Sequence, residues 1–270
     1  QISLGQGAIM AVGGYSAALL VTRLGLSMWL SFILAIFISA LFGLFLGLAA
    51  ARLSGPYLAG TTLVIALAIP TLANRFMSVL KGDEGLPVDV GYPPNWFTKL
   101  FGEPSYEQWQ LYVALPFAAI ALFLASNILL SRTGRMWRAI RDNETAAALS
   151  GVNFSRQKIF VFVVSATFAG LSGALYGLRG LVGPSVYPVS LSLLLLTAAV
   201  LGGIRSIFGA FIGTVIVVFL PDWIDAVLHQ FELSEQVSNF MPALVSSLLL
   251  ILTVVINPAG VAGTHLHKHK

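Results

Sequence analysis

The chain has 270 residues, of which 57% are hydrophobic and 10% are charged, and its formal charge is +4. Soluble domains carry roughly 25% charged residues. This composition, with a mean hydropathy of +0.88, therefore excludes a soluble protein and predicts an all-α, polytopic membrane protein. Basic residues that are spread over loops between apolar runs follow membrane topology, which argues against nucleic acid as the partner. The chain has no cysteine, which excludes a disulfide framework, a thiolate metal site and a cysteine nucleophile.

Eight apolar stretches meet or approach the length of about 20 residues that a helix needs to cross a bilayer. They are 4–22, 26–50, 57–79, 110–131, 159–178, 188–204, 206–220 and 240–257. The first lacks the basic start and the cleavage pattern of a signal peptide, so it is interpreted as a true span. The stretches 188–204 and 206–220 are short and are joined by LGGIRSIFG. Broken or half-spanning helices remain open for these two.

The segment 132–158 concentrates charge, with six basic and two acidic side chains in an otherwise apolar chain. If this segment is cytoplasmic, alternation places ten of the fifteen basic residues on its side and nine of the eleven acidic residues on the other. That orientation satisfies the positive-inside rule. The outer loops are then 81–109, where Trp109 is expected in the headgroup zone, and 221–239. The chain is predicted to form a single transmembrane domain, 1–270.

None of the eight predicted spans contains Asp or Glu. An ion-coupled carrier needs an ionisable site near the midplane, so this absence disfavours that class. An intramembrane enzyme is disfavoured as well, because the spans contain no cluster of catalytic groups or of metal ligands. Asn74, Arg75 and Arg179 lie at span ends, where snorkelling to the interface competes with a contact to a solute. The sequence therefore predicts no catalytic, cofactor-binding or metal-binding residues.

The charged segment is the natural contact for an energy-supplying partner. The chain has no G-x-x-x-x-G-K-[ST] phosphate loop, so the energy for uphill transport has to come from another protein. Helix formers dominate the segment and predict a short helix over 135–151. Its spacing fits ion pairs of Arg138 with Asp142 and of Arg141 with Glu144.

The same predicted helix offers apolar contact through Met136, Trp137 and Ile140. Gly151 is expected to end it in a left-handed conformation. Such a helix would fit a groove in a partner protein. The alternative is a solvated loop that only fixes the topology of the spans.

Small residues allow helices to approach closely, and G-x-x-x-G spacing occurs in GLFLG, GALYG and GAFIG. Two further glycines are adjacent in LGGIRSIFG. Close structural packing and a sliding gate fit such motifs equally well. The candidates for packing or gating are Gly43, Gly47, Gly173, Gly177, Gly202, Gly203, Gly209 and Gly213.

Three stretches carry a resemblance to a known family. RTGRMWRAIRDNETAAALSGVNFSRQKIFVFVVSATFAGLSGALYG resembles the signature of permease subunits of branched-chain amino acid ABC importers, as do LSLLLLTAAVLGGIRSIFGAFIG and SLGQGAIMAVGGYSAALL. The similarity covers nearly the whole chain in the family's order and is greatest to the LivM-like branch. GDEGLPV lies where that branch carries a T-G-G-x-x-G-[IL] loop. Family chains extend further at the N-terminus, so residue 1 is expected to fall inside the family fold.

The resemblance implies a permease subunit in the bacterial cytoplasmic membrane that is not an enzyme and needs no cofactor. It implies as partners a second homologous permease subunit, two cytoplasmic ABC ATPase subunits and a solute-binding protein outside. Relatives with similar motifs import urea or short amides, so the solute stays open between these and amino acids. The charged segment resembles the coupling helix of such permeases. The residues implied in ATPase coupling are Gly134, Arg135, Arg138, Arg141, Asp142, Asn143, Glu144 and Gly151.

Overall fold

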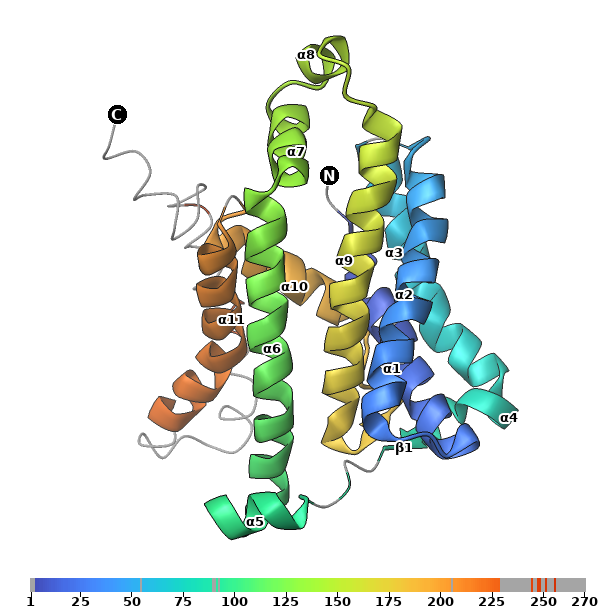
Figure 1. Ribbon diagram of the computed structural model, residues 1–270, viewed down its shortest axis with the longest axis vertical. Helices are drawn as coiled ribbons and strands as arrows, with labels where there is room; N and C mark the ends of the chain where they lie inside the picture. The colour runs from blue at the N-terminus through green and yellow to red at the C-terminus, as the bar shows by residue number, and fades with distance from the viewer. Residues whose placement is uncertain are drawn as a thin grey trace. The chain divides into compact units, whose positions relative to one another are not determined.

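The computed structural model describes residues 3–53, 55–88, 91, 93–204 and 206–228, with a few isolated positions beyond residue 240. The chain divides into two compact units, residues 1–192 and 193–270. Both are built from helices (Figure 1), which confirms the predicted all-α, polytopic fold. The single permease domain over 1–270 stays a prediction.

Six helices of the described residues are long and apolar enough to cross a membrane. They are α1 (Gln6–Leu24), α2 (Met28–Ala50), α3 (Pro56–Arg75), α6 (Tyr106–Leu130), α9 (Phe154–Tyr176) and α11 (Ile207–Leu228). Helix α10 (Val189–Gly202) has 14 residues, and its length of about 21 Å is less than the ~30 Å of the hydrocarbon core. The predicted span 240–257 lies outside the continuously described residues. Six of the eight predicted spans are therefore membrane-length helices.

The shorter elements lie between these helices. They are α4 (Met77–Leu80), η1 (Gly82–Glu84), β1 (Leu86–Pro87), α5 (Asn95–Phe101), α7 (Arg132–Asp142), α8 (Glu144–Leu149), η2 (Gly177–Arg179) and β2 (Leu181–Val182). The predicted span 57–79 is broken at Phe76, whose φ of −102° and ψ of 49° are not helical. The predicted span 206–220 is longer than expected, because α11 continues through Pro221. Membrane helices tolerate an internal proline when neighbouring groups satisfy the freed carbonyl.

The folded helices also carry carboxylates beyond the predicted span limits. Helix α6 begins early because Ser105 and Gln108 form a capping box. The Ser105 hydroxyl accepts from the Gln108 amide at 3.3 Å, and the Ser105 amide donates to the Gln108 side chain at 3.0 Å. Glu107 thus lies in the first turn of α6, where the helix dipole favours negative charge. Asp222 lies near the end of α11. The absence of Asp and Glu therefore applies to the predicted ranges and not to the full helices of the structure.

Helices α1, α2 and α9 form the closely packed core of the first unit (Figure 1). Glycines are required where these three helices touch each other. A methyl group on Gly13 would overlap the backbone of Gly170, and one on Gly173 would overlap the Met10 carbonyl, both between α1 and α9. A methyl group on Gly43 of α2 would overlap a side chain of α9. Gly13 and Gly170 were not predicted, because neither belongs to a G-x-x-x-G motif.

Two further predicted glycines are packed less tightly in the same unit. A methyl group on Gly47 would lie 3.1 Å from the Cα of Ile159 and from the Cβ of Phe162 in α9. One on Gly177 would lie 2.7 Å from a methyl carbon of Val182 in β2. Both glycines therefore allow close contact, while a gating role for them stays a prediction.

Helix α6 is attached to this core along its first half. The ring of Phe117 meets Phe32 edge-on at a centroid distance of 5.6 Å, and the Gln110 side chain donates to the Leu178 carbonyl at 2.7 Å. Trp109 is 8% exposed and packs in one cluster with Phe32 and Leu178. The Trp109 indole thus packs inside the protein, and its position in the headgroup zone stays a prediction.

A short antiparallel ribbon, β1 with β2, lies at the end of the first unit opposite α7 (Figure 1). Beside it, the Asn74 amide donates to the two Asp83 carboxylate oxygens at 3.3 and 3.2 Å. The Tyr187 hydroxyl donates to the Gly173 carbonyl at 2.7 Å, and burial raises the pKa of Tyr187 above its usual range. The loop GDEGLPV, which carries β1, is thus fastened to the loop that follows α9.

In the second unit, α10 and α11 also pack through glycines. A methyl group on Gly202 would overlap the Gly209 carbonyl, and one on Gly213 would overlap the Ala198 carbonyl. Gly203 has a φ of 103°, a conformation that other residues rarely adopt, where the chain turns after α10. The four predicted glycines of this region therefore pack or turn the chain, and gating by them stays a prediction.

Candidate functional site

The charged segment 132–158 folds as α7 and α8, followed by the first turn of α9. The predicted single helix over 135–151 is wrong, because Asn143 breaks it with a φ of −159° and a ψ of 106°. The Asn143 side chain accepts from the Ala146 amide at 2.9 Å and so caps the start of α8. Asn favours such caps over helix interiors, since its side chain competes for backbone hydrogen bonds.

The only ion pair among the described residues joins the neighbours Arg141 and Asp142, with Nη2 3.1 Å from Oδ1. The predicted pairs of Arg138 with Asp142 and of Arg141 with Glu144 do not form. Asp142 pairs with its neighbour Arg141 instead of Arg138, and the break at Asn143 separates Arg141 from Glu144. Arg138 is exposed and has no carboxylate partner in the part of the chain described. Its charge is available to another protein. The same described residues contain no group of three or more His, Cys, Asp or Glu that could hold a metal.

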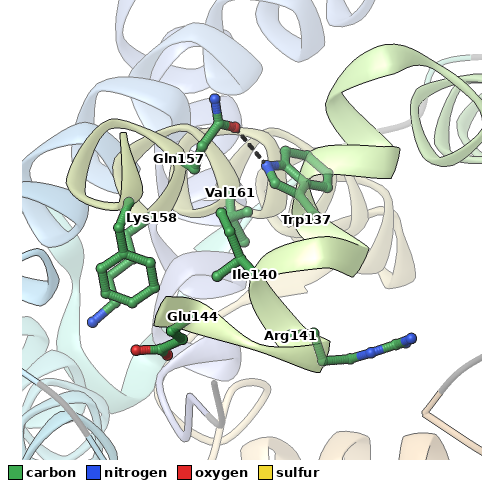
Figure 2. Close-up of a pocket in the computed structure, with 8 residues that line it drawn as sticks. Trp137, Ile140, Arg141, Glu144, Gln157, Lys158 and Val161 are labelled. Carbon is green, nitrogen blue, oxygen red and sulfur yellow. Dashed lines mark hydrogen bonds between the residues drawn. The ribbon is translucent and has the colours of Figure 1, made fainter. Parts of the chain in front are cut away.

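The apolar side of α7 faces α9. The Trp137 indole donates to the Gln157 side chain at 3.0 Å, and its ring lies 5.9 Å from that of Phe160. A pocket of about 260 Å³ lies between the two helices, and Figure 2 shows Ile140 and Val161 on its walls. Trp137 therefore contacts α9 within the chain and Ile140 lines the pocket, but both stay partly exposed, and their contact with a partner stays a prediction.

Helix α8 presents the most exposed large apolar side chain of the segment. Leu149 is 86% exposed, whereas Ala147, two residues earlier, is 5% exposed. Leu149 was missed in the sequence, where apolar contacts were sought only on the part that became α7. The run ETAAALSG contained the signal, because a leucine beside a glycine stop ends an otherwise small and polar helix. The exposed side chains of α7 and α8, among them Arg138 and Leu149, are together termed the coupling surface.

Two glycines form the turns at the limits of this surface. A methyl group on Gly134 would overlap the Leu129 carbonyl, so the chain can pass from α6 into α7 only with glycine there. Gly151 has a φ of 85°, and its amide donates to the Ala148 carbonyl at 3.0 Å. The predicted left-handed ending at Gly151 is confirmed. The part of either glycine in coupling stays a prediction.

Lys158 ties the segment to the first half of the chain. It is 6% exposed, and its ammonium donates to the Leu53 carbonyl, after α2, at 3.1 Å. The ammonium also lies 4.2 Å from the centroid of the Phe154 ring. No described carboxylate pairs with it, so the carbonyl and the ring stabilise the buried charge. The start of α9 is thereby fixed to the turn between α2 and α3.

Replacing Lys158 by methionine is expected to destabilise the protein by roughly 1–3 kcal/mol, because the Leu53 carbonyl loses its donor. Thermal unfolding of the purified protein in detergent measures this effect. The control Lys158→Arg keeps a donor and is expected to lose less. Equal unfolding midpoints for the wild type and Lys158→Met would show that the tether contributes no stability.

Comparison with known proteins identifies the family of this chain. A family model described as "Branched-chain amino acid transport system / permease component" matches residues 1–256. The high-affinity branched-chain amino acid transport system permease protein LivM of Salmonella typhimurium is 33% identical over an alignment of 234 positions that covers 80% of this chain and 55% of LivM. LivH of the same organism is 26% identical over an alignment of 273 positions, gaps included, that covers 97% of this chain and 85% of LivH. The autoinducer 2 import system permease protein LsrC of Klebsiella pneumoniae is 32% identical over 146 residues, 51% of this chain and 41% of LsrC.

No solved structure matches the chain. The chain spans about half the length of the LivM relative, 55% by alignment. Its apolar helices and its relatives show a multi-pass protein of the bacterial cytoplasmic membrane. The resemblance noted in the sequence is confirmed, and the chain belongs to the family of permease components of branched-chain amino acid transport systems.

Proposed function

We propose that the chain is the permease subunit of an ATP-driven ABC importer and that the coupling surface receives an ATPase subunit. The observation that carries this proposal is the outward position of Arg138 and Leu149, with the apolar side of α7 bound to α9 through Trp137. A partner seated there makes charged and apolar contacts at once. Because α7 rests on α9, its displacement reaches the helices of the core.

The proposed assembly contains a second homologous permease subunit, two ABC ATPase subunits and a solute-binding protein on the outer side. LivM and LivH, which are both permease proteins of high-affinity branched-chain amino acid transport systems, support a pair of related permeases. The coupling residues Arg135, Arg138, Arg141 and Glu144 are exposed and supply charge to the ATPase contact. Such charges mainly raise the rate of association and make it depend on salt.

The proposed solute is a branched-chain or other amino acid, as the name of the LivM relative suggests. A second candidate is urea or a short amide, and the relative LsrC, named for autoinducer 2 import, supports variation of solute within the family. An ion-coupled carrier is the third candidate. Glu107 and Asp222 are carboxylates in membrane-length helices, but both lie near helix ends and away from a midplane position.

Uptake by the reconstituted transporter tests the proposal. The chain is co-expressed with its companion permease and ATPase subunits and placed in proteoliposomes with the binding protein. Leucine uptake is expected to require ATP and to persist when an ionophore collapses ion gradients. Uptake that stops with the ionophore and ignores ATP depletion would support the ion-coupled carrier. Uptake of urea or acetamide in place of leucine would support the second candidate.

A further inference from the structure

A pocket of about 410 Å³ opens between the first half of α6 and the end of α9. It lies at the end of these helices opposite α7 and α8 (Figure 1). Its volume falls in the range of ~300–1,000 Å³ that is usual for small-molecule sites. Leu111, Ala114 and Leu175 supply apolar wall, and Glu107 and Arg179 supply opposite charges. No coupling residue belongs to this pocket.

The two charges line the same pocket without pairing with each other. Glu107 makes no ion pair or side-chain hydrogen bond with any described residue, and Arg179 has no carboxylate partner among them. Both side chains are exposed, and an exposed ion pair contributes little stability, so each charge stays accessible to another charged group. Because they stay apart here, the pocket has room for a ligand that presents a negative group to one and a positive group to the other.

The wall of the pocket holds the Arg179 guanidinium in place. The Arg179 guanidinium donates to the Tyr176 hydroxyl at 3.1 Å and lies 5.3 Å from the centroid of that ring. The Gln110 side chain donates to the Leu178 carbonyl at 2.7 Å, which joins α6 to the turn after α9. A site whose groups are already oriented loses less entropy when a ligand binds.

We propose that this pocket binds the transported solute as a zwitterion with an apolar side chain. Arg179 binds the α-carboxylate through charge-assisted hydrogen bonds, Glu107 binds the α-ammonium group, and Leu111 and Leu175 contact the side chain. The proposal rests on the proposed transport function and adds a solute site to it. Snorkelling explains an arginine at a helix end, and the helix dipole favours Glu107 in the first turn of α6, but neither effect requires the two opposite charges to line one apolar pocket.

Cysteine labelling tests the site directly, because the chain has no cysteine of its own. Ser172→Cys and Ala114→Cys each place one thiol in the pocket, and Ser78→Cys places a control thiol on exposed α4. The probes are a maleimide and leucine, applied to the assembled transporter. Leucine at ten times its dissociation constant is expected to slow labelling of both pocket cysteines about tenfold by mass action. Labelling of the control cysteine is expected to stay unchanged.

Charge variants then assign the two ends of the ligand. Leucine protects the pocket cysteines when it slows their reaction with the maleimide. Arg179→Gln is expected to weaken this protection about tenfold or more, and Arg179→Lys is expected to restore part of it. Leucinamide lacks the carboxylate, so its weaker protection is expected to be the same with and without Arg179→Gln. Glu107→Gln is expected to weaken the protection of the pocket cysteines by leucine. Protection by 4-methylpentanoate, which lacks the ammonium group, is expected to stay unchanged.

The possible outcomes separate this proposal from the proposed function. Protection that depends on both charges, in a complex that shows no ATP-driven uptake, would support the pocket and refute the transport function. ATP-driven leucine uptake without protection at either pocket cysteine would overturn the pocket. Protection that both charge variants leave intact, or equal protection by urea or acetamide, would overturn it as well.

Discussion

Replacing Gly173 by leucine is expected to prevent the permease from folding and to abolish uptake. The Cα of Gly173 lies so close to α1 that even a methyl group would overlap the Met10 carbonyl. Backbone cannot move aside as a side chain can, so α1 and α9 would have to separate along their contact. Overpacking of a well-packed core typically costs about 1–3 kcal/mol, and a forced separation of two helices exceeds that. Size-exclusion chromatography of the detergent-solubilised variant measures the loss of the folded protein.

The matched control is Gly60→Leu, in α3. A side chain at Gly60 would meet no atom within 4 Å, so this variant adds the same bulk in open space. It is expected to elute as the wild type and to transport normally. Gly173→Ala is expected to fall between the two leucine variants. A monodisperse, active Gly173→Leu protein would remove this contact both as a packing requirement and as a gate.

Replacing Leu149 by aspartate is expected to release the ATPase from the permease while leaving the permease folded. Leu149 is 86% exposed, so the change disturbs little inside the chain. Loss of an apolar side chain that is buried in a protein interface weakens binding by about 2 kcal/mol. This loss corresponds to an affinity about 30-fold lower. Co-purification of tagged permease with the ATPase subunits, followed by ATP-dependent uptake, measures the effect.

Charge reversal at Arg138 is expected to act in the same direction, with Arg138→Glu separating ATP hydrolysis from transport. Arg52→Glu is the control, because Arg52 is an exposed arginine in the turn after α2, outside α7 and α8. The control is expected to retain the ATPase. Normal retention and uptake with both Leu149→Asp and Arg138→Glu would leave the charged segment with a role in topology alone.

The sequence predicted the membrane helices well because hydropathy is a property of each stretch by itself. The limits of α6 and α11 depended instead on local chemistry. A capping box at Ser105 starts α6 before the apolar run, and α11 passes through Pro221 because membrane helices tolerate that residue. The break at Phe76 has no comparable signal in the sequence. Such limits follow from single contacts that hydropathy does not record.

The candidate site was predicted in its place along the chain but not in its orientation. Basic residues and Gly151 marked the segment, yet the choice of the outward side depends on which side of α7 meets α9. Trp137 was predicted only as a partner contact, yet it also contacts Gln157 within the chain, while Leu149 was overlooked. Gly13 was missed for the same reason, since its neighbour across the helix contact is 157 positions away in the chain.

Helix α9, together with α2, to which Lys158 ties its start, has the proportions of an unequal lever on α1. Its 23 residues extend about 35 Å, and its closest contacts with α1, at Gly170 and Gly173, lie nearer its end than its start. Along α9, the distance from this contact to Lys158 is about 20 Å, and the distance from it to Tyr176 is about 7 Å. Spin labels at the two ends would show whether they move in opposite senses. Under the proposed coupling to an ATPase, a displacement of about 3 Å at the start of α9 would produce an opposite displacement of about 1 Å at its end, so a large movement on one side would become a small one on the other.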